Sequence, residues 1–387
     1  MKRIAIFFDG TWNRHDAPHQ TNVVLMSRAV AHSDADGNVQ IVQYYPGVGS
    51  GRGSSRIARF SDKILGGALG MGVVDVLAEA YRNLVFSYEL GDEIYVFGFS
   101  RGAYTARMFV GLLRCSGIFT RQYVGEISNA IARFQQHQKW TAPDHERSLS
   151  WRAGFAPYTA TSDVDLEQRL ERGLQSIKLE IPYVGLWDTV KSLAVPQTVP
   201  GAQKFNEKPR AFFDLKLSRM VKAARHAMAL DERRYLFTPV EWSNLKDLNS
   251  QAGEGRPFRQ EWFPGDHGSV GGGGEVAGLS SHALEWIVAG AREAGLRFSE
   301  PDLEEALMPR DAMAPLTNKI GEQGMLARVL AALTQDRAGP RGMDDLSAVA
   351  MERCRRDGSY LPHRSLKEVH PMVVAALQKE NDDTRVT

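Results

Sequence analysis

The chain has 387 residues, of which 43% are hydrophobic and 24% are charged, as in an ordinary globular protein with a sizeable core. Its formal net charge of +1 gives no electrostatic case for binding nucleic acid or an anionic membrane surface. Two isolated cysteines exclude a disulfide framework and a cysteine metal site, and no stretch reaches the roughly 18 apolar residues that a membrane span needs.

Strand-like and helix-like patterns alternate along the chain. The patterns predict strands at Arg3–Phe8, Val39–Tyr45, Glu93–Phe99, Ile181–Trp187 and Arg259–Phe263. They predict helices at Val73–Tyr88, from Arg101 onward, at Leu217–Leu230 and at Leu279–Ala294. Alternation of this kind predicts an α/β fold, in which helices cover both faces of a mostly parallel central sheet. The first apolar run is too short for a signal peptide, so we expect a protein that is cytoplasmic as synthesised.

Two stretches interrupt this alternation. Residues 119–180 and 192–214 are polar, contain proline and are dotted with aromatic side chains. We interpret both as insertions over the carboxyl edge of the sheet, within one α/β domain that spans residues 1–300. In residues 301–387 short helical patterns are broken by proline and glycine. They are expected to form a helical extension packed on the same domain, with frayed last residues.

The most informative motif is Gly98–Gly102, a G-x-S-x-G with Ser100 at its centre. It lies between a predicted strand and a predicted helix, which is the context that a nucleophilic serine on a sharp turn requires. The glycines allow the turn and the close packing of the helix, and the serine hydroxyl stands at the positive end of that helix. An ordinary glycine-rich turn, as in a dinucleotide-binding fold, is the alternative, so the serine needs partners.

A serine nucleophile requires a base and an acid, which in α/β-hydrolases follow in the order Ser, Asp or Glu, His, each after a sheet strand. His267 lies in a glycine-rich loop directly after the last predicted strand, and Asp188 ends the predicted sheet strand before it. The alternatives are a solvent-exposed loop histidine and a carboxylate that caps a helix. Asp266 is a weak substitute for the acid, because the side chains of neighbouring residues normally diverge.

The loop after the first strand, Asp9–Asn13, is the candidate source of an oxyanion donor. Acyl transfer needs two donors aimed at the tetrahedral intermediate, and we assign them to the backbone N–H of Arg101 and that of Gly10 or Thr11. A strand that ends in Asp-Gly-Thr also occurs in phosphatases with an aspartate nucleophile and magnesium. Those enzymes need a second acid where this chain has Thr11. Asp9 is therefore interpreted as a structural carboxylate that accepts N–H groups of its own loop.

An enzyme that binds an acyl chain needs an apolar groove and a cover for it. Ile127, Ile131 and Phe134 have the helical spacing of an amphipathic lid helix that would line such a groove, and the glycine-rich segment Ile64–Val74 is a second candidate. The alternative is that both segments simply pack on the sheet.

Five sequence blocks resemble, in order, the signatures of one bacterial family, a group of uncharacterised α/β-hydrolases that includes the first class of type VI secretion phospholipase effectors. The blocks are Phe7–Asn13, Gly98–Arg107, Gly185–Val190, Arg225–Arg233 and Trp262–Gly274. The resemblance implies an α/β-hydrolase core, a Ser-Asp-His triad and hydrolysis of ester bonds in lipids. By motif position the triad falls on Ser100, Asp188 and His267. The resemblance also implies export by a signal-independent system such as type VI secretion, with a secretion-apparatus or immunity protein as partner.

The residues and the resemblance together predict a serine hydrolase of the lipase or phospholipase type, without a cofactor or a metal. Its expected substrate is a lipid or another ester, reached through peripheral membrane contact, and no nucleic acid partner is expected. Two alternatives stay open. One is a cytoplasmic carboxylesterase that acts on a small soluble ester, and the other is a catalytically silent binding module on a hydrolase fold.

Overall fold

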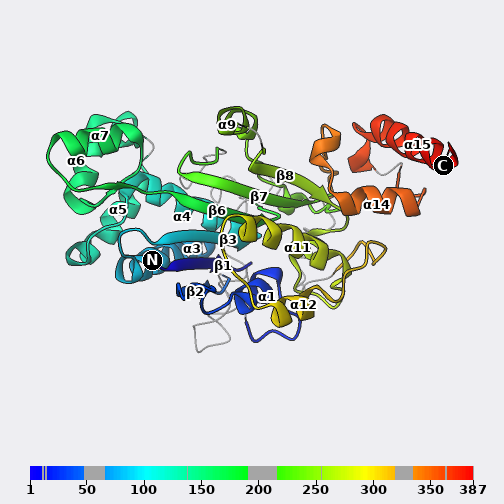
Figure 1. The fold of residues 1–387 in the computed structure, drawn as a ribbon, viewed down its shortest axis with the longest axis horizontal. Helices are drawn as coiled ribbons and strands as arrows, with labels where there is room; N and C mark the ends of the chain where they lie inside the picture. The colour runs from blue at the N-terminus through cyan, green and yellow to red at the C-terminus, as the bar shows by residue number, and fades with distance from the viewer. Residues whose placement is uncertain are drawn as a thin grey trace.

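The computed structural model describes residues 1–10, 13, 15–47, 66–136, 138–190, 216–253, 255–318, 334–361 and 364–386. Within these ranges the central sheet has six parallel strands in the order β2-β1-β3-β6-β7-β8 (Figure 1). The strands are β1 (Arg3–Phe8), β2 (Gln40–Tyr45), β3 (Glu93–Phe99), β6 (Ile181–Trp187), β7 (Val221–Ala229) and β8 (Phe258–Phe263). A separate pair, β4 (Thr159–Ala160) and β5 (Ile177–Lys178), is also parallel. The predicted mostly parallel α/β architecture is confirmed.

Helices cover both faces of the sheet. The α-helices are α1 (Asn22–Ala29), α3 (Gly66–Ser87), α4 (Arg101–Ser116), α5 (Ile127–Phe134), α6 (Glu146–Phe155), α7 (Asp163–Glu171), α9 (Leu245–Ala252), α10 (His267–Gly271), α11 (Gly278–Glu293), α12 (Glu300–Leu307), α14 (Ala348–Arg356) and α15 (His370–Val386). Short 3-10 helices occupy Arg121–Glu126, Lys139–Thr141, Tyr235–Phe237, Met343–Asp345 and Arg364–Leu366. None of the helices in the described ranges is long and apolar enough to cross a membrane.

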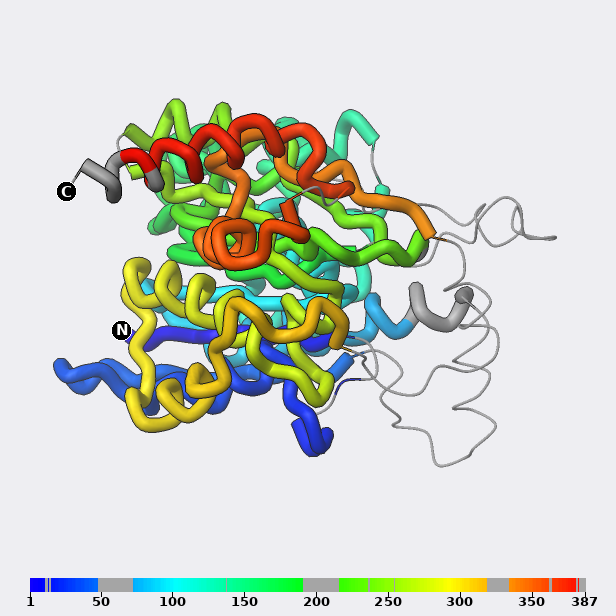
Figure 2. Tube along the Cα trace, turned by 90° about the vertical axis from the view of Figure 1, so that its right-hand side faces the viewer, coloured from blue at the N-terminus to red at the C-terminus, as the bar shows by residue number. Residues whose placement is uncertain are grey.

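The two faces of β1 show how the core is divided. Ile4, Ile6 and Phe8 pack with α3 and α4, whereas Ala5 and Phe7 pack with α1, α11 and α12 on the other face. Side chains alternate between the faces of a strand, so a strand buried on both sides reads as a continuous apolar run. The N-terminal strands and the C-terminal helices lie at opposite edges of the sheet, as the blue and red segments of Figure 2 show.

One predicted element is wrong. The segment Leu217–Leu230 was expected to be a helix, but most of it forms β7, which lies between β6 and β8. Its alanines, arginine and methionine are good helix formers, so the local pattern favours a helix. In the folded chain Ala224 faces one core and Ala227 the other, and this burial on both faces overrides the local preference.

The segment 119–180 lies at the amino edge of the sheet rather than over its carboxyl edge. It connects the carboxyl end of α4 to the start of β6, and such helix-to-strand connections in a parallel sheet run along the amino edge. Figure 1 shows α5, α6 and α7 gathered at one end of the molecule, away from α14 and α15. The other expected insertion, 192–214, lies outside the described residues.

The lid candidates are placed differently from the expectation. Ile127 and Ile131 of α5 are buried in the core formed with α3 and α4, and the ring of Phe134 packs closely over Gly111 of α4. Gly111 is roughly 16 Å along α4 from Ser100, at 1.5 Å per residue. The structure thus places Ile127 and Ile131 in the core and packs the half-buried Phe134 against it, which is the packing alternative that the sequence left open. Of Ile64–Val74, the first two residues lie outside the described part, and the rest begins α3.

The segment after residue 300 packs against the last two strands. Leu346, Ala350 and Tyr360 share a buried cluster with Met228 of β7 and Trp262 of β8. Because the cluster is continuous from strand to helix, this segment contributes to the same core that holds the end of the sheet.

Candidate active site

Ser100 occupies a strained turn between β3 and α4. Its φ of 59° and ψ of −124° lie in a region that residues other than glycine rarely adopt, as a nucleophilic serine on a sharp elbow requires. The flanking glycines make the turn sterically feasible. A Cβ at Gly98 would lie 2.6 Å from the carbonyl oxygen of Gly102, and one at Gly102 would overlap the carbonyl oxygens of Phe8 and Asp9. The motif therefore allows α4 to pack directly on the end of β1.

His267 is the first residue of α10, directly after the turn that follows β8. Its Nε2 lies 2.8 Å from the Oγ of Ser100, and only 2% of its surface is exposed. The imidazole ring packs against the rings of Phe99 and Phe237, with centroids 4.6 and 4.8 Å away. Asp266 caps α10 by accepting the N–H of Ser269, so its carboxylate serves the helix rather than the histidine.

Asp188 follows β6, with a φ of 37° and no exposed surface. Its Oδ2 lies 2.6 Å from Nδ1 of His267, and its Oδ1 accepts the backbone N–H of Ala229 at 3.0 Å. The sequence indicated that Asp188 and His267 follow consecutive strands. In the structure β7 lies between β6, which Asp188 follows, and β8, which precedes His267. Ser100, His267 and Asp188 nevertheless meet, because the carboxyl ends of parallel strands share one edge of the sheet.

Arg337 completes the surroundings of the acid and was missed by the sequence reasoning. Its Nη1 donates to Oδ1 of Asp188 at 2.6 Å, and its Nη2 donates to Oδ2 at 2.9 Å. Burial would raise the pKa of Asp188. The charge of Arg337 and the hydrogen bonds from His267 and Arg337 hold that pKa well below its usual range. Arg337 lies 149 residues from Asp188 and in no recognisable motif, so no local signal could have identified it.

His226 is a second residue that the sequence reasoning did not place at the site. It lies on β7, is fully buried, and its Nε2 accepts the backbone N–H of Thr189 at 3.1 Å. Burial, together with the positive charge of Arg107, lowers the pKa of His226 to about 3. The ring is therefore neutral at physiological pH and holds the residue that follows Asp188.

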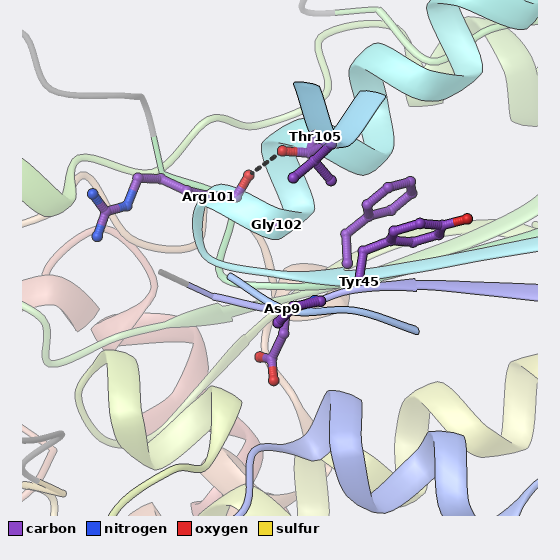
Figure 3. Close-up of a pocket in the computed structure, with 8 residues that line it drawn as sticks. Asp9, Tyr45, Arg101, Gly102 and Thr105 are labelled. Atoms are coloured by element: carbon purple, nitrogen blue, oxygen red, sulfur yellow. Dashed lines mark hydrogen bonds between the residues drawn. The ribbon is translucent and has the colours of Figure 1, made fainter. Parts of the chain in front are cut away.

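Asp9 is a structural carboxylate. It is buried and accepts the backbone N–H of Gly10 at 2.7 Å, the hydroxyl of Thr21 at 3.0 Å and that of Tyr44 at 2.7 Å. Burial raises the pKa of Asp9 to about 6, although the bonds from Tyr44 and Gly10 act in the opposite direction. Figure 3 shows the carboxylate directed away from Arg101 and α4. These contacts show the carboxylate engaged with its own loop and its neighbours, as the sequence indicated.

The expected oxyanion donors lie around the elbow. The N–H of Arg101 belongs to the first turn of α4, where N–H groups point out of the helix end. The backbone of Gly10 approaches closely, since a Cβ there would lie 3.3 Å from that of Ser100. Its N–H points to Asp9 in this structure, and Thr11 lies outside the described residues.

A small pocket opens beside the elbow, between the ends of β1 and β2 and the start of α4 (Figure 3). Its lining residues are Phe8, Asp9, Tyr45, Pro46, Val76, Arg101, Gly102 and Thr105. Arg107, two residues beyond Thr105 in α4, donates to the carbonyl oxygen of Val240 at 2.6 Å and lies over the ring of Trp242. Within the described ranges, no three His, Cys, Asp or Glu side chains are grouped as metal ligands would be.

A parallel sheet that presents a serine on a strand-to-helix elbow, facing a histidine and an aspartate from later strand ends, defines the α/β-hydrolase class. Within that class, residues 2–290 match the model of the catalytic domain of Tle1-like phospholipase effectors of the type VI secretion system, and the chain belongs to this family. Arg337 lies beyond the matched residues.

Several known proteins are similar to the chain. One is the uncharacterized protein YEL023C of Saccharomyces cerevisiae, 26% identical over 254 residues, which are 62% of this chain and 33% of that protein. An uncharacterized protein from Pseudomonas aeruginosa is 18% identical, with a TM-score of 0.40 over 80% of this chain and 49% of that one. The Tle1 effector bound to the VgrG spike is 19% identical, with a TM-score of 0.37 over 70% of this chain and 51% of that one.

The chain thus spans about a third of the length of the curated relative and about half of each of these two structures.

Proposed function

We propose that the chain is a serine hydrolase that cleaves carboxylic ester bonds in lipids, as a phospholipase, through an acyl-enzyme. One observation carries the proposal, the continuous line of contacts from Ser100 through His267 to Asp188. The Oγ to Nε2 distance is 2.8 Å and the Nδ1 to Oδ2 distance is 2.6 Å. Both are hydrogen-bond distances, as a nucleophile, its base and the orienting acid require. Membership of a phospholipase effector family supports a lipid ester as substrate.

In the acylation step, Oγ of Ser100 attacks the carbonyl carbon of the ester while Nε2 of His267 takes the hydroxyl proton. Asp188 accepts the hydrogen bond from Nδ1, which fixes the tautomer and stabilises the imidazolium. The tetrahedral intermediate collapses, the bond to the alcohol oxygen breaks, and His267 returns the proton to the leaving alcohol. In deacylation the same base removes a proton from water, which attacks the acyl-enzyme and releases the carboxylic acid and Ser100.

The negative oxygen of the intermediate is assigned to the N–H of Arg101 and a second donor from the Gly10 or Thr11 backbone. The Gly10 N–H donates to Asp9 at 2.7 Å, so an oxyanion held there would share a bifurcated bond with that carboxylate. Preorganised donors of this kind stabilise charge that develops only in the transition state, and each one is worth roughly 10²–10³ in rate.

We propose further that residues 1–300 are the hydrolase domain and that residues 301–387 are an extension packed on it. The family description supports export by type VI secretion and a secretion-apparatus protein as partner. Lipid hydrolysis would bring the protein into peripheral contact with a membrane.

The test is a panel of p-nitrophenyl esters of rising chain length, assayed beside phospholipid vesicles, with Ser100→Ala as control. Turnover of long-chain esters and vesicles that disappears in the variant supports the proposal. Turnover confined to short soluble esters would assign the chain to the carboxylesterases. A protein that neither hydrolyses any ester nor is labelled at Ser100 by a fluorophosphonate would be a binding module on a hydrolase fold.

A further inference from the structure

The two terminal nitrogens of Arg337 donate all of their hydrogen atoms in hydrogen bonds at the site. Nη1 donates to Oδ1 of Asp188 at 2.6 Å and to the carbonyl oxygen of Ala229 at 2.8 Å. Nη2 donates to Oδ2 of Asp188 at 2.9 Å and to the carbonyl oxygen of Phe237 at 2.6 Å. The two carbonyl groups fix the plane of the guanidinium, and the fork matches both carboxylate oxygens.

The setting makes this contact different from a surface ion pair. Arg337 is 7% exposed and Asp188 is fully buried, so solvent screens the pair little. A buried carboxylate with no cation beside it would tend to take up a proton. Phe237 links the arginine to the base directly, because its carbonyl accepts from Arg337 while its ring packs on the imidazole of His267.

We propose that Arg337 is a positioning residue of the triad, which holds the Asp188 carboxylate with Oδ2 toward His267 and sets the basicity of that histidine. The inference rests on the proposed hydrolase function, since it assigns His267 as the base. Two consequences follow from the geometry. The carboxylate stays ionised and cannot rotate away from Nδ1. Its charge is also shared with a cation, so it stabilises the imidazolium less than an isolated carboxylate would.

The other carboxylates near His267, those of Glu232 and Asp266, have hydrogen-bond partners other than Arg337. Oε2 of Glu232 accepts the backbone N–H of His267 at 3.3 Å and is itself paired with Arg234 at 2.6 Å. Asp266, the preceding residue, is engaged in capping α10. Arg337 is hydrogen-bonded to Asp188 itself, so its removal acts on the imidazole mainly through that carboxylate, with a smaller contribution through Glu232, whose pKa Arg337 also helps to lower.

The first measurement does not depend on turnover. The ring protons of His267 are followed by NMR as pH is varied, in the unsubstituted protein and in Arg337→Ala. Loss of the cation should move the titration midpoint of the imidazole to higher pH, because the imidazolium is then stabilised by a carboxylate whose charge is no longer shared. The ascending limb of kcat/KM should move in the same direction. An unchanged midpoint in a folded variant would overturn the proposal, whether or not the protein hydrolyses any ester.

The second measurement separates positioning from folding. Arg353 is a matched control, because it is also a buried arginine in the C-terminal segment and donates to the carbonyl oxygens of Ala312 and Ala314, each at 2.8 Å, but it does not contact Asp188. Arg337→Ala should lower kcat by about 10- to 100-fold with little change in KM. Arg353→Ala should leave unchanged kcat, the ascending limb of kcat/KM and the titration midpoint of the imidazole.

If Arg337→Ala does not fold, Arg337→Lys carries the test. Lysine keeps a cation but cannot hold both carboxylate oxygens and both carbonyl groups at once. A folded lysine variant with reduced kcat supports the proposal, because the charge is kept and only the fixed geometry is lost. Wild-type kcat in that variant would overturn the proposal, because a cation beside Asp188 would then suffice without the fixed fork. An inactive wild-type protein whose His267 midpoint still shifts in Arg337→Ala would refute the proposed function and leave the electrostatic coupling in place.

Discussion

The Oγ of Ser100 lies 2.8 Å from Nε2 of His267, although 166 residues separate them in the chain (267 − 100 − 1). Both side chains are almost fully buried, at 5% and 2% exposed surface. The contact joins the elbow after β3 to the first residue of α10, so the geometry of the candidate site depends on elements from opposite halves of the sheet.

The first prediction concerns the triad. Ser100→Ala and His267→Ala should each lower the rate of ester hydrolysis by a factor of about 10³ or more. The double variant should be only slightly slower than either single variant, because the residues act as a unit. Asp188→Asn should lose somewhat less, since the loop is retained while the imidazolium loses its support. Initial rates on a p-nitrophenyl ester measure each effect. Additive losses in the double variant would contradict the shared mechanism.

The second prediction concerns the elbow. Gly102→Ala places a Cβ against the carbonyl oxygens of Phe8 and Asp9, which are backbone atoms that cannot rotate away. We expect a loss of about 1–3 kcal/mol in the free energy of unfolding. We also expect a loss of about 10² in kcat/KM, because the nucleophile is displaced. Gly154→Ala is the matched control, since this glycine of α6 has nothing within 4 Å of a built Cβ. Equal stability of the two variants would be inconsistent with close packing at the elbow.

The third prediction concerns the buried His226. Its pKa is about 3 in the folded chain and about 6.5 when unfolded, so between these values the unfolded state binds the additional proton. Stability from this group is complete above pH 6.5 and falls as pH decreases toward 3, by at most about 1.4 kcal/mol per pH unit.

His226→Gln removes the titration and keeps an acceptor for Thr189. Urea unfolding between pH 5 and 7 should then show a shallower decline with acid than the wild type. The exposed His32→Gln is the control and should leave the slope as it is. A slope that His226→Gln does not alter would mean that this ring does not titrate on unfolding.

The fourth prediction concerns Asp9, whose folded pKa is raised to about 6 from an unfolded value near 3.8. The folded state therefore binds more protons in this window, and the stability from this group, complete below pH 3.8, is lost as pH rises through 6. Asp9→Asn should remove this dependence, so the difference in unfolding free energy between pH 4.5 and 7 should change by about 2 kcal/mol. Tyr44→Phe, which removes one donor to the carboxylate, should instead increase the dependence.

Much of the sheet could be predicted from local sequence. The bounds expected for β1, β3 and β6 agree with the structure at both ends, and those for β2 and β8 differ by one residue. Parallel strands buried on both faces are continuous apolar runs, and turn residues mark their ends. The Gly98–Gly102 elbow could also be predicted from the sequence, because its glycines meet a steric requirement that is local.

The sequence by itself therefore determined the strand-turn-helix around Ser100 and the positions of Asp188 and His267 just after strand ends, because short-range sterics and side-chain periodicity act within a few residues. Tertiary structure alone decided that Val221–Ala229 is a strand, since burial between β6 and β8 outweighs its helical preference. It alone also placed α5 in the core and brought Arg337 to the acid across 149 residues. Contacts of that range depend on how the whole chain packs, and no local pattern encodes them.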